Sequence, residues 1–210
     1  MATPVVANIL YGPAVIWHRP MTYVAFNPAT LDNIGVDGTF PGGSPDYWER
    51  FGYTEGPTAF QYERTEKAVS VNEHLGEVIR FATDEKAKFT FTLKEVNPAT
   101  FNRATGFVYT TAVVQPGGGN AGSEQFLVGD QPALDVRMWC ISGTSFTIAG
   151  VAMPVRLFIW RGTARVTSPM GWEREETPKI EVEISALVDP LYSKGQRLFA
   201  FRKLWYGIVA

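Results

Sequence analysis

The segment 86–96 constrains the fold most strongly, because polar and apolar side chains alternate along it. Lysines and threonines occupy one set of alternate positions. The other set is apolar and consists of Ala87, Phe89, Phe91 and Leu93. A period of two places successive side chains on opposite faces of a β-strand. The segment therefore predicts a strand with one face on a core and the other in water or in an aqueous channel.

The remaining sequence favours an all-β fold with one short helix. Twenty glycines, 14 prolines and 13% aromatic residues are typical of many short strands joined by turns. Strands are expected at 4–18 (two, split by Gly12-Pro13), 60–64, 69–72, 107–114, 134–141, 145–151, 155–166, 179–186 and 198–201. The segment 155–166 alternates poorly, which favours a strand covered on both faces. A helix is predicted at 98–105, with Asn97 as its N-cap and Gly106 as its stop. The spacing of apolar residues in 75–82 weakly favours two further helical turns.

The chain is long enough for one sizeable core, so we expect a single β-sandwich domain over 1–210. A long loop at about 19–56 interrupts it, rich in proline and glycine. Long loops in compact domains are often functional. Aromatic side chains in such a loop bury against either the parent domain or a neighbouring molecule. The candidates for contact between subunits or rings are Phe40, Tyr47, Trp48, Arg50 and Phe51.

Charge and composition exclude several classes of protein. The formal net charge of −2 and the pI near 5.8 provide no basic excess to hold nucleic acid. The N-terminal residues lack the pattern of a signal peptide, and no apolar run is long enough to span a membrane. We therefore expect a protein made and kept in a cytoplasm-like compartment. The lone cysteine, Cys140, lies in an apolar run and is expected to be a buried thiol.

The sequence offers little enzymatic chemistry, and we expect neither catalytic activity nor a metal or other cofactor. The two histidines, His18 and His74, lack the spacing of paired metal ligands, and each is expected on the surface or in a polar pocket. Glycines 117, 119 and 122 match G-x-G-x-x-G, but Gly129 and Pro132 interrupt the helix that would hold a pyrophosphate. We interpret this stretch as a mobile loop.

Charged side chains on two predicted strands allow more than one interpretation. Lys86, Lys88 and Lys94 form a basic stripe, which is either a contact with an anion or another subunit, or a solvated face that protects a sheet edge. Glu181 and Glu183 share one strand face. Two carboxylates so placed could form a glycosidase pair, but alternation alone produces such pairs, so a solvated face is favoured.

Several segments in order resemble the tail tube (major tail) proteins of long-tailed bacteriophages. The first is G-P-T-A-F-Q-Y-E-R-T at 56–65, followed by Val69-Ser70-Val71 and Glu77-Val78. The second is F-T-F-T-L-K-E-V at 89–96, which leads into a short helix. The third is I-E-V-E-I-S-A-L-V-D-P at 180–190, followed by Gly195 and Leu198-Phe199. The resemblance covers roughly 56–106 and 150–200.

This resemblance implies a virion protein with a β-sandwich or barrel-like subunit and a flanking helix. In the family, subunits form hexameric rings, one sheet of each joins a β-barrel around a lumen, and stacked rings guide DNA to the host. The implied partners are further copies of the chain, a tape-measure protein and a tail terminator. No membrane is implied, and the virion tail would be assembled in the host cytoplasm. The candidate lumen-facing residues are Glu181 and Glu183, with Lys86, Lys88 and Lys94 as rivals.

Two other interpretations stay open. One is a different virion ring protein, such as a tail terminator, a tail completion protein or a head decoration protein. The other is a carbohydrate-binding β-sandwich that uses Trp48, Trp172 and Trp205 as stacking platforms.

Overall fold

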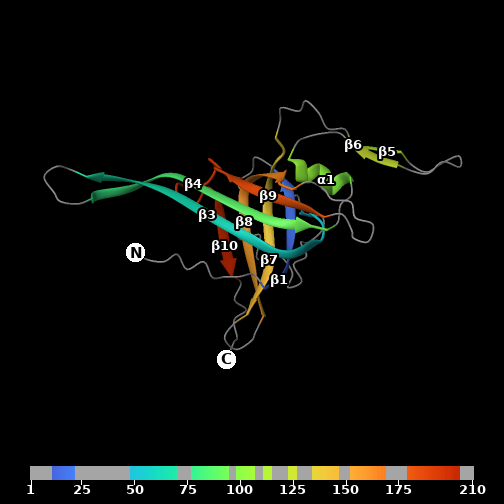
Figure 1. Ribbon diagram of the computed structural model, residues 1–210, viewed down its shortest axis with the longest axis horizontal. Helices are drawn as coiled ribbons and strands as arrows, with labels where there is room; N and C mark the ends of the chain where they lie inside the picture. The colour runs from blue at the N-terminus through green and yellow to red at the C-terminus, as the bar shows by residue number, and fades with distance from the viewer. Residues whose placement is uncertain are drawn as a thin grey trace.

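The structure of the protein, a computed structural model, describes residues 11–21, 48–70, 77–94, 98–106, 111–114, 123–126, 134–146, 152–168 and 179–203. Within these residues the chain is built of β-strands and one short α-helix (Figure 1). The expected all-β class with a short helix is confirmed.

Among the described residues, eight strands form one antiparallel sheet, and two more pair in a separate small sheet. The large sheet has the order β2-β1-β7-β8-β9-β4-β3, with β10 also paired to β8. Its strands are β1 (Tyr11–Pro20), β2 (Glu49–Arg50), β3 (Thr54–Ser70), β4 (Glu77–Leu93), β7 (Val136–Phe146), β8 (Ala152–Val166), β9 (Ile180–Leu187) and β10 (Phe199–Lys203). The small sheet pairs β5 (Thr111–Val114) with β6 (Ser123–Phe126). Strand β8 is central, since β7 pairs along one of its edges while β10 and β9 share the other.

The large sheet curls until the start of β3 meets β1, so that it encloses a core. The amide of Phe51 donates a hydrogen bond to the carbonyl of Ile16 at 2.8 Å. The hydroxyl of Thr54 donates to the carbonyl of Ala14 at 2.6 Å. The inward-facing side chains that fill the core are Ala14, Ile16, Phe51, Phe89, Phe91, Leu93, Ala104, Trp139, Ile141, Leu157, Ile159, Ala164, Ile180, Val182 and Ile184. The alternation at 86–96 thus places its apolar side chains in this core, as predicted.

A second apolar cluster lies on the outer face of β1, β7 and β8. Its buried members are Trp48, Met138, Cys140, Phe158 and Trp160. Strand β8 therefore carries buried apolar side chains on both faces between Val155 and Trp160. This double burial explains why the first half of the strand does not alternate, and it confirms the expectation for 155–160. In the second half only one face is covered, since Arg165 is exposed.

The helix α1 (Pro98–Thr105) packs against the large core through Phe101 and Ala104. Gly106 ends the helix with a φ of +72°, a left-handed conformation that glycine adopts without a steric penalty. The carbonyl of Gly106 accepts a hydrogen bond from the amide of Asp135 at 2.8 Å. The predicted bounds of the helix and its glycine stop are confirmed.

Other predicted elements are wrong in their type or bounds. The segment 75–82 is not helical where it is described, because β4 begins at Glu77 and pairs with β3, with Ile79 opposite Val69. The strand predicted at 134–141 continues as β7 through Gly143 to Phe146, because β8 pairs along this whole length. Cross-strand pairing, which depends on a distant segment, overrides local propensity here.

The N-terminal part also differs from expectation. The strand β1 continues through Gly12-Pro13, where the sequence predicts a break, and its register with β7 is irregular between Tyr11 and Val15. The rest of the first predicted strand, 4–10, lies outside the described residues. The predicted long loop at about 19–56 contains β2 near its end, where Trp17 of β1 pairs with Arg50. Residues 22–47 lie outside the described part of the chain.

Candidate functional site

One face of the sheet formed by β3, β4, β9 and β8 is polar. The strand registers place Gln61, Lys88, Ser185 and Thr163 in one row across this face. The next row consists of Ala59, Thr90, Glu183 and Arg165. Residues opposite each other in an antiparallel sheet project to the same side. We call the outward side chains of these four strands, from Glu55 on β3 to Arg165 on β8, the polar face.

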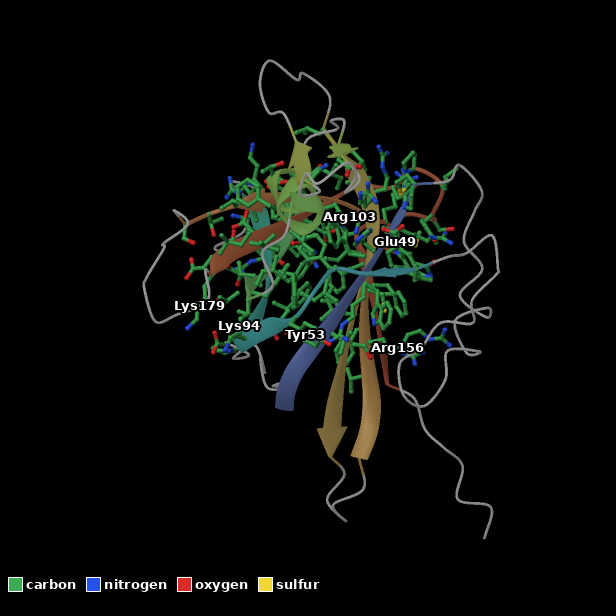
Figure 2. All side chains as sticks on the ribbon, turned by 90° about the vertical axis from the view of Figure 1, so that its right-hand side faces the viewer. Glu49, Tyr53, Lys94, Arg103, Arg156 and Lys179 are labelled. Atoms are coloured by element: carbon green, nitrogen blue, oxygen red, sulfur yellow. The ribbon has the colours of Figure 1, made fainter. Side chains whose placement is uncertain are left out.

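Opposite charges on the polar face neutralise each other. Glu183 accepts ion pairs from Arg165 at 2.7 Å and from Lys88 at 3.6 Å. Glu55 forms ion pairs with both Lys94 and Lys179, each at 3.1 Å. Figure 2 labels these two lysines. These cations lower the pKa of Glu55 through hydrogen bonds, most of all that from Lys179. The face therefore presents paired charges, although it is rich in lysine.

The two sets of candidate lumen residues lie on the same face, so they are not rivals. Thr92 pairs with Glu181 and Thr90 with Glu183, which places the glutamates among Lys86, Lys88 and Lys94. Lys88 does not protect a sheet edge, because it pairs with Gln61 of β3 on one side and with Ser185 of β9 on the other. The sequence interpretation is wrong for this residue, since the position of a strand within a sheet is not encoded in its own alternation. Lys86 lies beyond the part of β4 that pairs with β9.

The aromatic segment that precedes β3 is divided between the two apolar clusters. Trp48 is 5% exposed and packs on Phe158, while Phe51 is fully buried against Trp139 and Phe91. Both side chains bury against the parent domain, which is one of the two possibilities that the sequence leaves open. They are thus not available as contacts to a neighbouring ring in this conformation. The side chain of the exposed Arg50 stacks on Tyr53, with Cζ 4.2 Å from the centroid of the tyrosine ring.

The remaining two aromatic candidates, Phe40 and Tyr47, lie outside the described residues, as do Trp172 and Trp205. The burial of Trp48 removes one of the three platforms on which the carbohydrate-binding interpretation rests.

A partly buried ionic cluster around His18 joins β1, β2, β7 and α1. His18 is fully buried, with Nε2 3.8 Å from the carboxylate of Glu49 and Nδ1 3.3 Å from Nη1 of Arg137. Glu49 also pairs with Arg103 of α1 at 2.5 Å, and Arg137 pairs with Asp135 at 2.5 Å. Figure 2 labels Glu49 and Arg103. We call these five residues the His18 cluster. Sequence reasoning assigned His18 to a surface or a polar pocket, and it lies in the second of these environments.

The His18 cluster predicts a loss of stability in mild acid. Burial, reinforced by the positive charges of Arg103 and Arg137, holds the pKa of His18 well below its ordinary value. In the unfolded chain, the imidazole of His18 therefore takes up a proton as the pH falls through about 6.5. In the folded chain it stays neutral at this pH. As the pH falls below that value, the free energy of unfolding should fall by up to about 1.4 kcal/mol per pH unit.

Urea denaturation between pH 7.5 and 5.5 measures this effect, with His18→Gln as the comparison. The variant should show a flatter dependence on pH over this interval, because it lacks the titrating imidazole. An equal slope in both proteins would contradict the assignment to His18.

Glu183 gives a second prediction for this site. Glu183→Gln removes the charge that holds Lys88 and Arg165, and it should lower the free energy of unfolding by about 1–2 kcal/mol. Glu181→Gln is the matched control, since the exposed Glu181 lies on the same strand and face and should change stability by less than about 0.5 kcal/mol. Urea midpoints of the two variants decide the prediction, and equal losses would contradict it.

A long hairpin made by β3 and β4 projects from the body of the protein (Figure 1). Residues 61–68 on one strand and 80–86 on the other are all exposed, so both faces of this part are open to solvent. Within the described residues β3 forms a strand ladder only with β4, so its other edge is unpaired beyond the start of the strand, which contacts β1. Sequence reasoning missed this arm. The charged, alternating residues 60–66 were the available signal, but they do not show how far a strand extends from its core.

Several sequence candidates for chemistry are buried or lie outside the described residues. Cys140 is buried, and burial raises the pKa of its thiol. His74 and glycines 117, 119 and 122 fall in undescribed segments. Among the described residues, no group of three His, Cys, Asp or Glu side chains could hold a metal ion. The helix found in the described part of the chain is too short to cross a membrane.

Comparison with known proteins adds no family, because the sequence matches no protein-family model and no curated protein.

Proposed function

We propose that the chain is a non-enzymatic structural subunit that assembles with copies of itself into stacked rings, and that these form the tail tube of a long-tailed bacteriophage. The observation that carries the proposal is the polar face, whose charges are mutually paired on a sheet with an open edge strand. The sequence resemblance to tail tube proteins supplies the phage context and the hexameric ring.

The polar face is suited to a channel through which DNA slides. Free cations bind phosphate strongly and release counterions, which would hold DNA in place. On this face Glu183 forms ion pairs with Lys88 and Arg165, and Glu55 forms one with Lys94. The electrostatic attraction of these cations for phosphate is therefore small. A surface of mixed, paired charge stays hydrated and lets a polyanion pass.

The open edge of β3 supports assembly with further copies. An unpaired strand edge is a template for pairing with another chain. A head-to-tail contact between identical subunits closes into a ring when the rotation permits, and rings can then stack into a filament. Such a tube would meet a tape-measure protein and a tail terminator in the virion.

Negative-stain electron microscopy of the purified protein tests this function. We expect rings or tubes with a central hole. Single rings that never stack would favour a terminator, completion or decoration protein. A strict monomer that binds glycans would overturn the proposal in favour of a carbohydrate-binding module.

A further inference from the structure

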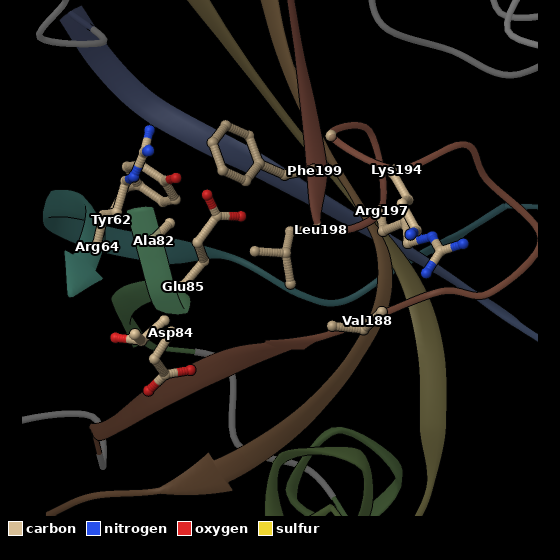
Figure 3. Close-up of a pocket in the computed structure, with 12 residues that line it drawn as sticks. Tyr62, Arg64, Ala82, Asp84, Glu85, Val188, Lys194, Arg197, Leu198 and Phe199 are labelled. Atoms are coloured by element: carbon tan, nitrogen blue, oxygen red, sulfur yellow. The ribbon is translucent and has the colours of Figure 1, made fainter. Parts of the chain in front are cut away.

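Two further groups of charged side chains differ in burial. The first lines an open groove between the projecting hairpin and the turn that leads into β10, where Arg64, Asp84 and Lys194 are exposed (Figure 3). Water screens the interactions of such groups, so a change in their charge has little effect on the fold. The second group is the His18 cluster, in which the imidazole is fully buried. Because histidine is the side chain that changes its charge most readily between pH 5 and 8, mild acid can act on the structure here.

The neighbours of His18 hold its ring in the neutral form. Its Nδ1 lies 3.3 Å from Nη1 of Arg137. A guanidinium only donates hydrogen bonds, so Nδ1 accepts and the hydrogen of the ring is on Nε2. A protonated ring carries a hydrogen on both nitrogens, and its Nδ1–H would face a donor of Arg137. Protonation of His18 therefore breaks its contact with Arg137.

The charges around His18 balance only while the ring is neutral. Among the described residues, the charged groups that face it are Glu49 of β2, Arg103 of α1, and Arg137 of β7 with its partner Asp135. They contribute two positive and two negative charges, and each carboxylate is paired with an arginine. The adjacent Arg19 projects to the other face of the sheet, over the ring of Trp48. A proton on His18 thus adds an uncompensated positive charge at a fully buried position, where it costs more than at the surface.

Two contacts within this cluster connect it to the helix α1. Arg103 belongs to the helix and pairs with Glu49, whose carboxylate lies 3.8 Å from Nε2 of the imidazole. The side chain of Asp135 holds Arg137, and its amide donates a hydrogen bond to the carbonyl of Gly106 at 2.8 Å, where the helix ends. A shift of Glu49 or of Arg137 is therefore transmitted to α1.

The helix can yield more easily than the strands. It is eight residues long and packs on the core through Phe101 and Ala104. The strand β1, in contrast, pairs with β7 from Tyr11 to Pro20. A segment with few buried apolar contacts opens at a lower free energy than a strand within a sheet. The repulsion in the cluster is therefore relieved by movement of α1.

We infer that protonation of His18 releases α1 from the core, so that the His18 cluster is an acid-sensitive latch for this helix. The opening is local, because the sheet stays paired while the helix leaves it, and it does not depend on the proposed tail tube. Burial and the two arginines keep the imidazole neutral while α1 is closed. Once α1 opens, the ring is hydrated and ionises near its ordinary pKa of about 6.5. The equilibrium constant for opening should therefore rise about tenfold from pH 7.5 to 5.5.

Hydrogen exchange measured by mass spectrometry tests the latch, with the rates corrected for the intrinsic effect of pH on exchange. The amides of 98–106 should exchange through a local opening, with a larger opening constant than those of β7. We expect this constant to rise about tenfold between pH 7.5 and 5.5. An opening constant of α1 that does not depend on pH would overturn the inference. So would one equal to that of β7, because the helix would then open only when the whole protein unfolds.

Substitution of each histidine assigns the response, since the sequence contains only two. His18→Gln should abolish the dependence on pH, because glutamine can accept the hydrogen bond from Arg137 but does not titrate. His74→Gln is the matched control and should keep the tenfold rise. A rise that persists in His18→Gln, or one that disappears in His74→Gln, would overturn the inference. The second comparison holds even if His18→Gln does not fold.

Discussion

Gly106→Ala should destabilise the protein by about 2–5 kcal/mol, the sum of a backbone and a steric penalty. The φ of +72° at Gly106 is left-handed, which costs an alanine roughly 1–2 kcal/mol. An added Cβ would also clash with the carbonyl oxygen of Ala164. Because that oxygen belongs to the backbone of the central strand β8, it cannot move away without disturbing the sheet.

Gly56→Ala is the matched control for this prediction. Gly56 has nearly the same φ, +73°, but nothing lies within 4 Å of the Cβ that would be added. Only the backbone penalty should remain there, about 1–2 kcal/mol. Urea denaturation, monitored by tryptophan fluorescence, measures the free energy of unfolding of both variants. Equal decreases in the two variants would show that the contact with Ala164 adds no steric penalty.

Asparagine separates the two penalties further, because it tolerates the left-handed region better than alanine. Gly56→Asn should recover most of the stability lost in Gly56→Ala. Gly106→Asn should not recover, since its Cβ meets the same carbonyl. Recovery at Gly106 would assign the whole effect to backbone strain.

Phe51→Ala should lower the free energy of unfolding of the isolated subunit by about 3–5 kcal/mol. The ring is fully buried and meets Trp139 edge-on at a centroid distance of 5.3 Å. The centroid of the Phe51 ring also lies 5.6 Å from the centroid of the His18 ring. Removal of the Phe51 ring would therefore open the core beside the His18 cluster. The truncation leaves a cavity where the sheet ends meet, because the amide of Phe51 bonds to β1.

This prediction separates a core role from an interface role. Had Phe51 served as a ring-to-ring contact, the variant would lose assembly while the monomer kept its stability. Tyr53→Ala is the control, since Tyr53 is 60% exposed and its loss should cost only about 0.5–1 kcal/mol, through its contact with Arg50. Denaturation of the monomer and sedimentation of assemblies distinguish the two roles.

Much of the fold follows from local sequence patterns. The alternation in 86–96 and 179–186 predicts which side chains of β4 and β9 face the core, and Asn97-Pro98 with Gly106 predicts the bounds of α1. These signals are local, because a strand period and a helix stop depend on neighbouring residues. The candidate site was predicted only in part. The sequence identifies Lys88 and Glu183 but treats them as alternatives, although they form one ion pair. It does not identify Arg165 or Glu55, which complete the charge pairing of the polar face.

The sequence by itself determined that 86–96 and 179–186 form strands with one apolar and one polar face, and that a short helix ending at Gly106 follows the first of them. Only the tertiary structure decided that the lysines of β4 and the glutamates of β9 share that polar face, because their strands are about ninety residues apart and register is set by pairing. It also decided that Trp48 and Phe51 bury within their own subunit. The length of the hairpin was decided in the same way, since a strand extends as far as its partner pairs with it, and no single segment encodes that partner.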